Sequence, residues 1–409
     1  MRVLVLTHNL PRFSGDFSGT FIDALCRALA NQNSRVDVVA PHDVAYDATF
    51  SRPYHLATYK YAWPPSLQTV GYTRSLIGDL KPRTVSLLVT PAMLASGVAA
   101  CLRLIQAQRP DIIHAHWLLP NGLIGAIVSK VTGVPLVVSI PGSDLLVARL
   151  NPLTQVLARL TLGQAALATA NSRELESVAY TLGARPDRFD LIIYGVDPQS
   201  LLPNRETGLA LRKRLDIGDS EFVVLAVGRM VPKKGLRYLV EAMPNLLRAA
   251  PQARLLLVGD GEQRQALEHL SEQLGVAKKV HFAGVVPRHE IAAYYNAADV
   301  LAMPSITEPE DGLNVCVLDA MACAKPIVAT TVAGNPLVVH EGVNGCLVPE
   351  RQPDQLANRL AMLAKDEQKR EAFGAASRKL VEDQFSWSHI AHRYLEHFHR
   401  IASLSSGRG

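Results

Sequence analysis

Short apolar runs rich in Val, Ile and Leu alternate with helical stretches along most of the chain. In the first half the runs are RVLVLTHN, RVDVVAP, DIIHAHW and PLVVSI, and the first helical pattern extends from about Thr20 to Asn31. After a Pro-containing link at 198–208 the alternation restarts, with the runs FVVLAVGR, RLLLVGDG, KVHFAG, DVLAMPS, PIVAT and GCLVP. Alternation of this kind is typical of parallel sheets with crossover helices. It predicts an α/β chain built of two doubly wound, parallel-sheet domains.

The length of the chain also favours two domains. At 409 residues it exceeds what one ordinary hydrophobic core supports, since domains usually run to about 100–200 residues. We therefore predict an N-terminal domain over residues 1–200 and a C-terminal domain over residues 201–385. A last helix, within residues 386–409, is expected to pack back on the N-terminal domain. Apolar residues at helical spacing mark this helix: Ile390, Tyr394, Leu395, Phe398 and Ile401.

The composition is that of a well-buried globular protein, with 48% hydrophobic and 19% charged residues. The five cysteines are scattered and include no C-x-x-C pair, which indicates neither a disulfide framework nor a zinc site. The first residues, MRVLVL, are typical of a first strand rather than a secretion signal. We therefore expect the protein to act in the reducing environment of the cytoplasm.

One segment of the N-terminal half is both apolar and basic. Thr84 to Leu102 carries no charge, but its Pro, Gly, Ser and Thr residues favour a buried or membrane-grazing helix over a membrane span. Positions 60–109 contain a single acidic residue, Asp79, and six basic residues: Lys60, Arg74, Lys81, Arg83, Arg103 and Arg109. Such a segment suits the surface of an anionic membrane. The alternative is a solvated positive face beside a core helix. No helix-turn-helix, RNP or zinc-finger pattern supports nucleic-acid binding.

The motif VGRMVPKKG, residues 227–235, places Arg229, Lys233 and Lys234 in a loop between a strand and an apolar helix. A helix N-terminus attracts phosphate, and cations beside it would stabilise the negative charge that develops on a departing diphosphate. The alternative is a loop with ordinary surface cations.

A second motif consists of two spaced acids, Asp311 in EDGLNV and Asp319 in DAMACAKP. If a helix starts near Asn314, Asp319 lies about a turn and a half into it and can face back toward the loop. Carboxylates accept hydrogen bonds from sugar and ribose hydroxyls. The alternative role for Asp319 is a favourable interaction with the helix dipole.

The order of these motifs resembles that of retaining family 4 glycosyltransferases, which have the GT-B fold of two Rossmann-like domains facing across a cleft. The resemblance covers nearly all of the chain. It is carried by PRFSGDFSGTF, PDIIHAHWLLPNG, PGSDL, GVD, VGRMVPKKG, LLLVGDGE, HFAGVVP, PSITEPEDGLNVCVLDAMACAKPIVAT, AGNP and GVNGCLVP. It implies a metal-independent enzyme that transfers a sugar from a nucleotide-diphosphate donor, UDP- or GDP-linked, to a lipid-linked or saccharide acceptor. No other cofactor is expected.

The resemblance also implies individual roles. Arg229 and Lys234 would hold the donor diphosphate, and Gly15 would close over it from the first domain. The backbone of Val286 would contact the nucleobase, and Asp319 would accept from the ribose. The remaining donor contacts would come from the carboxylate of Asp311 and from the backbone of Gly312 and Leu313. The acceptor contacts would come from the N-terminal domain, through His116 and Asp144.

Three departures from the family pattern bear on the identity of the donor. Both acids of the pair are Asp where the family has Glu, which shortens their reach. Pro141 stands where a histidine is expected before Gly142, and Pro cannot donate a hydrogen bond. Leu337 stands where an acid is expected after AGNP.

The residues of HAHW raise the question of a metal, because His is a common ligand. We expect His114 and His116 to point to opposite faces of their strand, so that one ion could not use both. The chain also has no Asp-x-Asp. No metal site is therefore predicted, and His116 is expected either to contact substrate or to be a structural histidine.

Other functions stay open. A nucleotide-sugar 2-epimerase or a phosphorylase could share the two-domain architecture, because a fold does not determine chemistry. A phosphorylase would be longer and would carry a lysine for pyridoxal phosphate. A non-catalytic nucleotide-sugar binder is a further alternative. The chain lacks a G-x-G-x-x-G after a strand, which disfavours a dehydrogenase.

Overall fold

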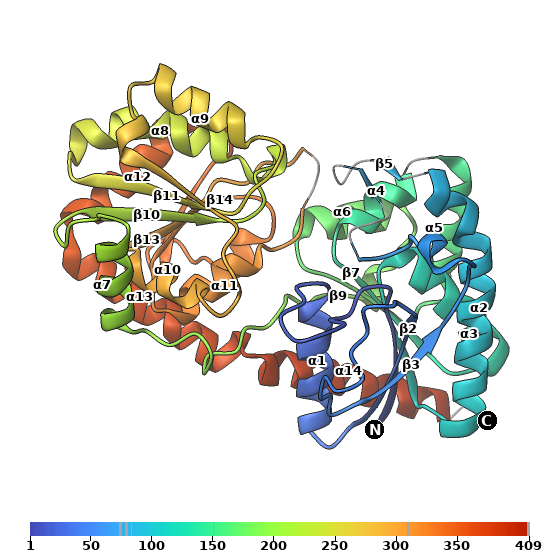
Figure 1. Ribbon diagram of the computed structural model, residues 1–409. Coiled ribbons are helices and arrows are strands. Elements are labelled where there is room, and N and C mark those ends of the chain that lie inside the picture. The colour runs from blue at the N-terminus through green and yellow to red at the C-terminus, as the bar shows by residue number, and fades with distance from the viewer. Residues whose placement is uncertain (73–75, 78–80, 83, 150, 309–310, 407–409) are drawn as a thin grey trace. The chain divides into compact units, whose positions relative to one another are not determined.

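The computed structural model describes residues 1–72, 76–77, 81–82, 84–149, 151–308 and 311–406 (Figure 1). Three charged residues of the basic segment, Arg74, Asp79 and Arg83, lie outside the described residues. The chain divides into two compact units. The first comprises Met1–Ile193 together with Trp387–Gly409, and the second comprises Tyr194–Ser386. Each is an α/β unit around its own parallel sheet.

In the first unit the described strands form a parallel sheet in the order β3-β2-β1-β6-β7-β8-β9. Their bounds are β1 (Arg2–Leu6), β2 (Arg35–Pro41), β3 (His55–Tyr59), β6 (Ile112–His116), β7 (Leu136–Ile140), β8 (Leu167–Ala170) and β9 (Phe189–Leu191). A short antiparallel pair, β4 (Leu76–Ile77) and β5 (Lys81–Pro82), stands apart from it. Because the strand order reverses between β1 and β6, the loops that follow these two strands leave the sheet side by side.

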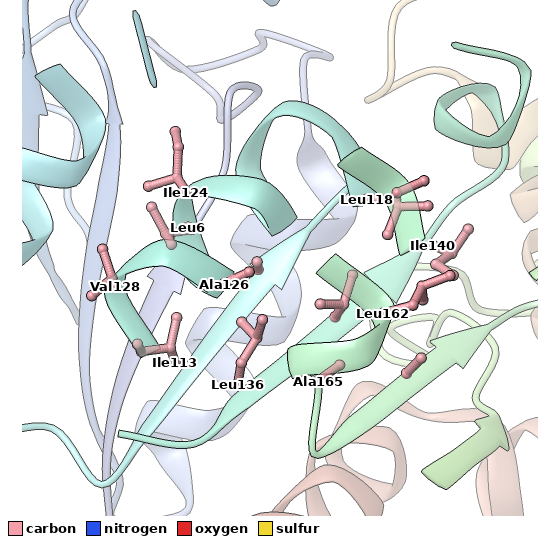
Figure 2. Packing of buried hydrophobic residues seen from close by; sticks show 14 of the residues in the cluster. Leu6, Ile113, Leu118, Ile124, Ala126, Val128, Leu136, Ile140, Leu162 and Ala165 are labelled. Atoms are coloured by element: carbon pink, nitrogen blue, oxygen red, sulfur yellow. The ribbon is translucent and has the colours of Figure 1, made fainter. Parts of the chain in front are cut away.

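Helices cover both faces of this sheet. They are α1 (Thr20–Asn31), α2 (Thr84–Gln108), α3 (Leu123–Thr132), α4 (Ser143–Arg149), α5 (Pro152–Gln164), α6 (Arg173–Thr181) and α14 (Trp387–Ser406). The short turns are η1 (Pro65–Leu67), η2 (Leu118–Gly122) and η3 (Pro186–Arg188). Side chains alternate along each strand, so Leu6 and Ile113 pack toward α3. Figure 2 shows Ile124 and Val128 of α3 and Leu162 of α5 in this core layer. On the other face α14 packs beside α1.

The second unit repeats this plan with the strand order β12-β11-β10-β13-β14-β15. The strands are β10 (Phe222–Val227), β11 (Ala253–Val258), β12 (Val280–Gly284), β13 (Val300–Met303), β14 (Ile327–Thr330) and β15 (Gly345–Val348). The helices are α7 (Arg205–Arg214), α8 (Leu236–Ala249), α9 (Arg264–Gln273), α10 (Ile291–Ala297), α11 (Val315–Ala322), α12 (Pro353–Lys365) and α13 (Glu367–Leu380). The turns are η4 (Pro232–Lys234), η5 (Ala277–Lys279), η6 (Asn335–Leu337) and η7 (Val381–Phe385). The strand order reverses between β10 and β13.

Several sequence predictions concern single elements. The helix predicted from Thr20 to Asn31 is confirmed by α1, and the helical pattern near the C-terminus is confirmed by α14. The link predicted over 198–208 is wrong at its end, because α7 begins at Arg205. The reason is a helix cap: the side chain of Asn204 accepts a hydrogen bond of 3.0 Å from the Thr207 amide.

Helix α2 contains the uncharged segment. Within the described residues, Leu88–Gln108 is the one stretch long and apolar enough to cross a membrane, by length and composition only. Met93 and Cys101 are fully buried against the sheet layer, but only 22% of the most apolar window is buried. One side of α2 therefore belongs to the core, and the rest faces outward.

Candidate active site

The loops after β10 and β13 meet at the switch point of the second sheet. These two strands are adjacent and parallel, with Val224 paired to Val300 and Leu225 to Leu301. Their carboxyl ends therefore open at the same place, which is where doubly wound sheets bind ligands. The motif VGRMVPKKG follows β10, and the loop that carries Asp311 follows β13.

The lysine loop is held close to the sheet by backbone contacts. Pro232–Lys234 form the turn η4, and Gly235 follows with φ +64°. A Cβ on Gly235 would lie 1.9 Å from the carbonyl oxygen of Pro304, so only glycine fits this approach. The Ile306 amide donates a 3.0 Å hydrogen bond to the Lys233 carbonyl, which ties the two loops together. Helix α8 then begins at Leu236.

Two lysines converge on one carboxylate. Nζ of Lys234 lies 2.6 Å from Oδ2 of Asp311, and Nζ of Lys233 lies 3.2 Å from Oδ1. Burial acts to raise the pKa of Asp311, but the two ammonium groups outweigh it and hold the pKa below its usual value. Lys234 also contacts the side-chain oxygen of Asn314, the residue before α11. The carboxylate is therefore charged at neutral pH, and a compact cluster of positive charge surrounds it.

Asp319 is buried in α11, which begins at Val315 as the sequence predicts. Its Oδ2 accepts a 3.0 Å hydrogen bond from Nη1 of Arg288 and lies 3.5 Å from the Tyr295 hydroxyl. Burial raises the pKa of Asp319, and Arg288 opposes the rise. The other oxygen, Oδ1, is buried without a hydrogen-bond partner among the described residues. An unsatisfied buried acceptor is costly, so this oxygen is a place for a donor from a ligand.

The other predicted donor-side residues lie at the same edge of the sheet. Arg229 is exposed in the loop after β10, and Val286 is half-buried after β12. Gly312 and Leu313 are buried next to Asp311. Sequence reasoning did not assign Arg288, although it follows a predicted strand in HFAGVVPRHE. It also gave no role to Asn314, whose side chain bonds both Lys234 and the Ser305 hydroxyl.

The two glutamates near Asp311 differ from it in their surroundings. Glu308 is largely exposed and forms an ion pair of 2.8 Å with Arg351. Glu310 lies outside the described residues. Just before Glu308, the amide and hydroxyl of Thr307 both bond the carboxylate of Glu350, which fixes the first part of this loop.

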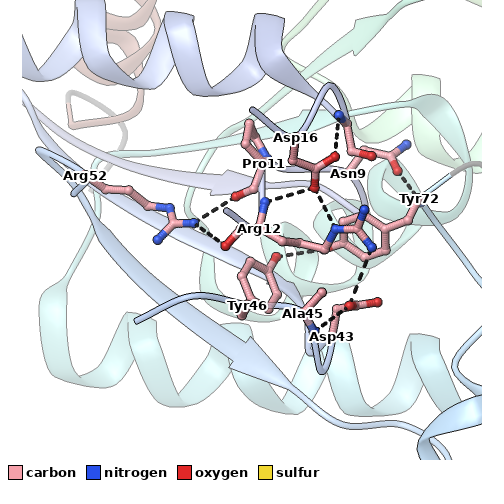
Figure 3. Close-up of polar contacts among 10 residues, drawn as sticks. Asn9, Pro11, Arg12, Asp16, Asp43, Ala45, Tyr46, Arg52 and Tyr72 are labelled. Atoms are coloured by element: carbon pink, nitrogen blue, oxygen red, sulfur yellow. Dashed lines mark hydrogen bonds and ion pairs between the residues drawn. The ribbon is translucent and has the colours of Figure 1, made fainter. Parts of the chain in front are cut away.

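In the first unit, the loop after β1 is held by an ion-pair network, shown in Figure 3. Nε of Arg12 lies 2.6 Å from Asp16, and the guanidinium lies over the ring of Tyr72. Burial acts to raise the pKa of Asp16, but its hydrogen bonds from Arg12 and Ser18 bring the pKa below its usual value. Gly15 lies exposed between these anchors with φ +88°, and a Cβ there would meet nothing within 4 Å. Its backbone is therefore open to an approaching ligand.

The prediction that His114 and His116 point to opposite faces of β6 is wrong. Side chains alternate along a strand, so residues two apart share a face. The two ring centroids lie 4.3 Å apart. Burial lowers the pKa of His116 to about 3, so the ring is neutral. Its Nε2 is buried without a hydrogen-bond partner among the described residues, whereas Nε2 of His114 lies 2.7 Å from the Ser139 hydroxyl.

The carboxylate of Asp144 is hydrogen-bonded to the backbone. Its oxygens accept hydrogen bonds from the amides of Leu118, at 2.5 Å, and Gly142, at 3.1 Å. Burial raises its pKa to about 6 despite these bonds. Asp144 thus ties the loop after β6 to the loop after β7, where Pro141 stands. Within the described residues no group of three or more His, Cys, Asp or Glu side chains could hold a metal ion.

The two doubly wound parallel sheets define the GT-B fold. The fold is that of the crystal structure of Anabaena HepE in complex with UDP. That structure superposes with a TM-score of 0.75 at 23% identity, over 98% of this chain and all of the other.

The chain belongs to the glycosyl transferases group 1 family. Residues 209–380 match that family, and residues 18–195 match a second family, the glycosyl transferase 4-like domain. A D-inositol 3-phosphate glycosyltransferase of Segniliparus rotundus is 31% identical, over 74% of this chain and 69% of its own. A GDP-mannose-dependent alpha-(1-6)-phosphatidylinositol monomannoside mannosyltransferase of Mycolicibacterium smegmatis is 33% identical, over 52% of this chain and 55% of its own.

Proposed function

We propose that this glycosyltransferase takes its sugar from a nucleotide-diphosphate donor bound at the carboxyl edge of the second sheet, with retention at the anomeric carbon. The observation that carries the proposal is the convergence of Lys233 and Lys234 at the switch point between β10 and β13. When the bond between the anomeric carbon and the diphosphate oxygen breaks, the nucleoside diphosphate leaves with the electron pair. Fixed cations at that position lower the barrier.

The remaining donor contacts follow from the same edge. The unpartnered Oδ1 of Asp319 can accept a hydrogen bond from a ribose hydroxyl, and the ion pair with Arg288 favours the charged form of that carboxylate. Arg229 and Lys234 would hold the diphosphate, with Val286 beside the base. The solved relative that contains UDP and the GDP-mannose-dependent relative support a UDP- or GDP-linked donor.

The donor should bind, and transfer should proceed, without a divalent metal, because Arg229 and Lys234 supply positive charge. We expect the right nucleotide sugar to raise the melting temperature in the presence of EDTA. At about 100 times its Kd a ligand stabilises by roughly 2.7 kcal/mol, or about 5–10 °C for a unit of this size. A thermal-shift screen of UDP- and GDP-sugars, followed by transfer assays in EDTA, tests both expectations. A shift that appears only after Mg²⁺ or Mn²⁺ is added would contradict metal independence.

The same screen separates the alternatives. A nucleotide-sugar 2-epimerase would convert the donor without an acceptor, and a non-catalytic binder would show the thermal shift without any product. Transfer to an added saccharide or lipid-linked acceptor, with the nucleoside diphosphate released, supports the transferase. In the first unit, the unpartnered Nε2 of His116 makes that residue the better acceptor-side candidate, because the carboxylate of Asp144 already binds backbone.

We also propose that the enzyme acts in the cytoplasm at the inner face of a membrane, with a lipid-linked acceptor as the reason. The support is the outward side of α2 together with Lys60, Arg103 and Arg109, all exposed. We expect the protein to float with vesicles that contain phosphatidylglycerol, and flotation to fall as salt rises, since exposed charges are screened. Flotation that does not respond to salt would contradict an electrostatic surface attachment.

A further inference from the structure

Three helices of the first unit expose apolar side chains on a common side. Helix α3 contacts both α2 and α5, and these helices cover one face of the sheet (Figure 1). Their outward residues are called the α2–α3–α5 face below. It comprises Val85 and Leu88 of α2, Ile127 and Val131 of α3, and Leu153, Val156 and Leu160 of α5. Val131, Leu153 and Leu160 are each more than 60% exposed.

These side chains do not belong to the hydrophobic core of the unit. The opposite sides of α3 and α5 already pack on the sheet through Ile124, Val128 and Leu162, all at most 4% exposed (Figure 2). In α5 the outward residues Leu153, Val156 and Leu160 recur at helical spacing, so they form a stripe along one side. An apolar stripe that spans neighbouring helices marks an interaction site more often than scattered exposed residues do.

The charges of the three helices are all of one sign. The sequences of α2, α3 and α5 contain no Asp or Glu. Their charged residues, Arg103, Lys130 and Arg159, are exposed, and within the described part of the chain none of them has an ion pair. This arrangement combines aliphatic side chains with unneutralised cations, whereas an ordinary solvated helix surface mixes both signs.

We infer that the α2–α3–α5 face is where the enzyme lies on an anionic lipid bilayer, so that contact extends over α3 and α5 beyond the basic segment at 60–109. A bilayer offers lipid phosphates to the cations and acyl chains to the aliphatic stripe. A second copy of the chain fits less well, because it would bring Lys130 and Arg159 against cations of the same kind. The inference rests on the proposed membrane location and gives it a surface and an orientation.

Variants of α3 and α5 test this face without touching the segment at 60–109. We expect Val131→Ser combined with Leu160→Ser to weaken binding to vesicles of phosphatidylcholine and phosphatidylglycerol by at least about tenfold, because two apolar side chains lose their burial. Lys130→Gln combined with Arg159→Gln should weaken it by a similar factor, and only on vesicles that contain phosphatidylglycerol. Flotation or co-sedimentation of the full chain measures both.

Matched controls lie in the second unit. Leu202 and Val343 are exposed to a similar extent, and Lys278 and Lys365 are exposed cations. Their Ser and Gln variants should bind vesicles like the wild type. Every variant should keep the wild-type melting temperature and the nucleotide-sugar thermal shift, which separates failure of the face from failure of the donor site.

If the α3 and α5 variants bind vesicles as tightly as the wild type does, the inference is overturned, and attachment through residues 60–109 still stands. Absence of wild-type binding to any vesicle would overturn both the face and the membrane location. If the wild type is instead a dimer in solution and the Ser variant is a monomer, the occupant is a second copy, and the lipid assignment is wrong.

Discussion

Replacing Lys234 by Ala is expected to lower the turnover number of sugar transfer by about 100-fold or more, comparable to the loss of one transition-state donor in other enzymes. Nζ of Lys234 lies in the loop after β10, 2.6 Å from Asp311. If the diphosphate departs there as proposed, it would gain negative charge, and the lysine would stabilise the transition state more than it stabilises the bound donor. The loss should therefore appear mainly in kcat, with a smaller change in KM.

The measurement is steady-state transfer with saturating donor, and Lys278→Ala, an exposed cation on the same unit, is the matched control. A thermal melt shows whether the variant is folded, because removal of Lys234 leaves Asp311 with Lys233 as its remaining lysine partner. A near-normal rate in a folded Lys234→Ala enzyme would move the diphosphate site away from this loop.

Asp311 pairs with the same two lysines whose positive charge a bound diphosphate would need under the proposed function. The carboxylate bridges Lys233 and Lys234, and its lowered pKa shows that the pair stabilises its ionised form. If the donor binds as proposed, phosphate oxygens would accept hydrogen bonds from the lysines, and Asp311 would accept hydrogen bonds from the sugar.

The sequence predicted the two parallel-sheet domains and the loops that carry charge, because strand periodicity and strand-end motifs are local signals. The contact between Lys234 and Asp311 depends on β13 lying beside β10, and strand order is not a local property. Arg288 was missed for the same reason, since its partner Asp319 lies 31 positions away in another element. The resemblance to a family placed the acids without revealing what binds them.

In the first unit one prediction was wrong, and two features could not be predicted. His114 and His116 were assigned to opposite faces by a wrong use of the two-residue strand period. Asp144 stays a prediction for the acceptor side, and the sequence could not show that its carboxylate accepts from two backbone amides. An apolar run such as that in α2 occurs both in buried helices and in exposed ones. The sequence therefore could not predict that one side of α2 faces outward.

The second prediction with a large expected effect concerns which acidic residue of the loop after β13 contacts the sugar. Asp311→Asn keeps the size of the side chain and removes its charge, and it should impair transfer at least about tenfold more than Glu308→Gln, a difference of roughly 1.4 kcal/mol in barrier. Asp311 is 14% exposed and bound by both lysines, whereas Glu308 is 77% exposed and paired with Arg351.

An Asn amide can offer its oxygen to only one of the two lysines, while its NH₂ group would face the other ammonium. The cluster would therefore lose its geometry as well as a charge that can accept sugar hydroxyls or steady positive charge on the anomeric carbon. Rates of transfer for the two variants, compared at saturating donor with folding checked by thermal melts, decide the assignment. If Glu308→Gln is the crippling change and Asp311→Asn is tolerated, Glu308 faces the sugar, and the loop adopts another register when the donor binds.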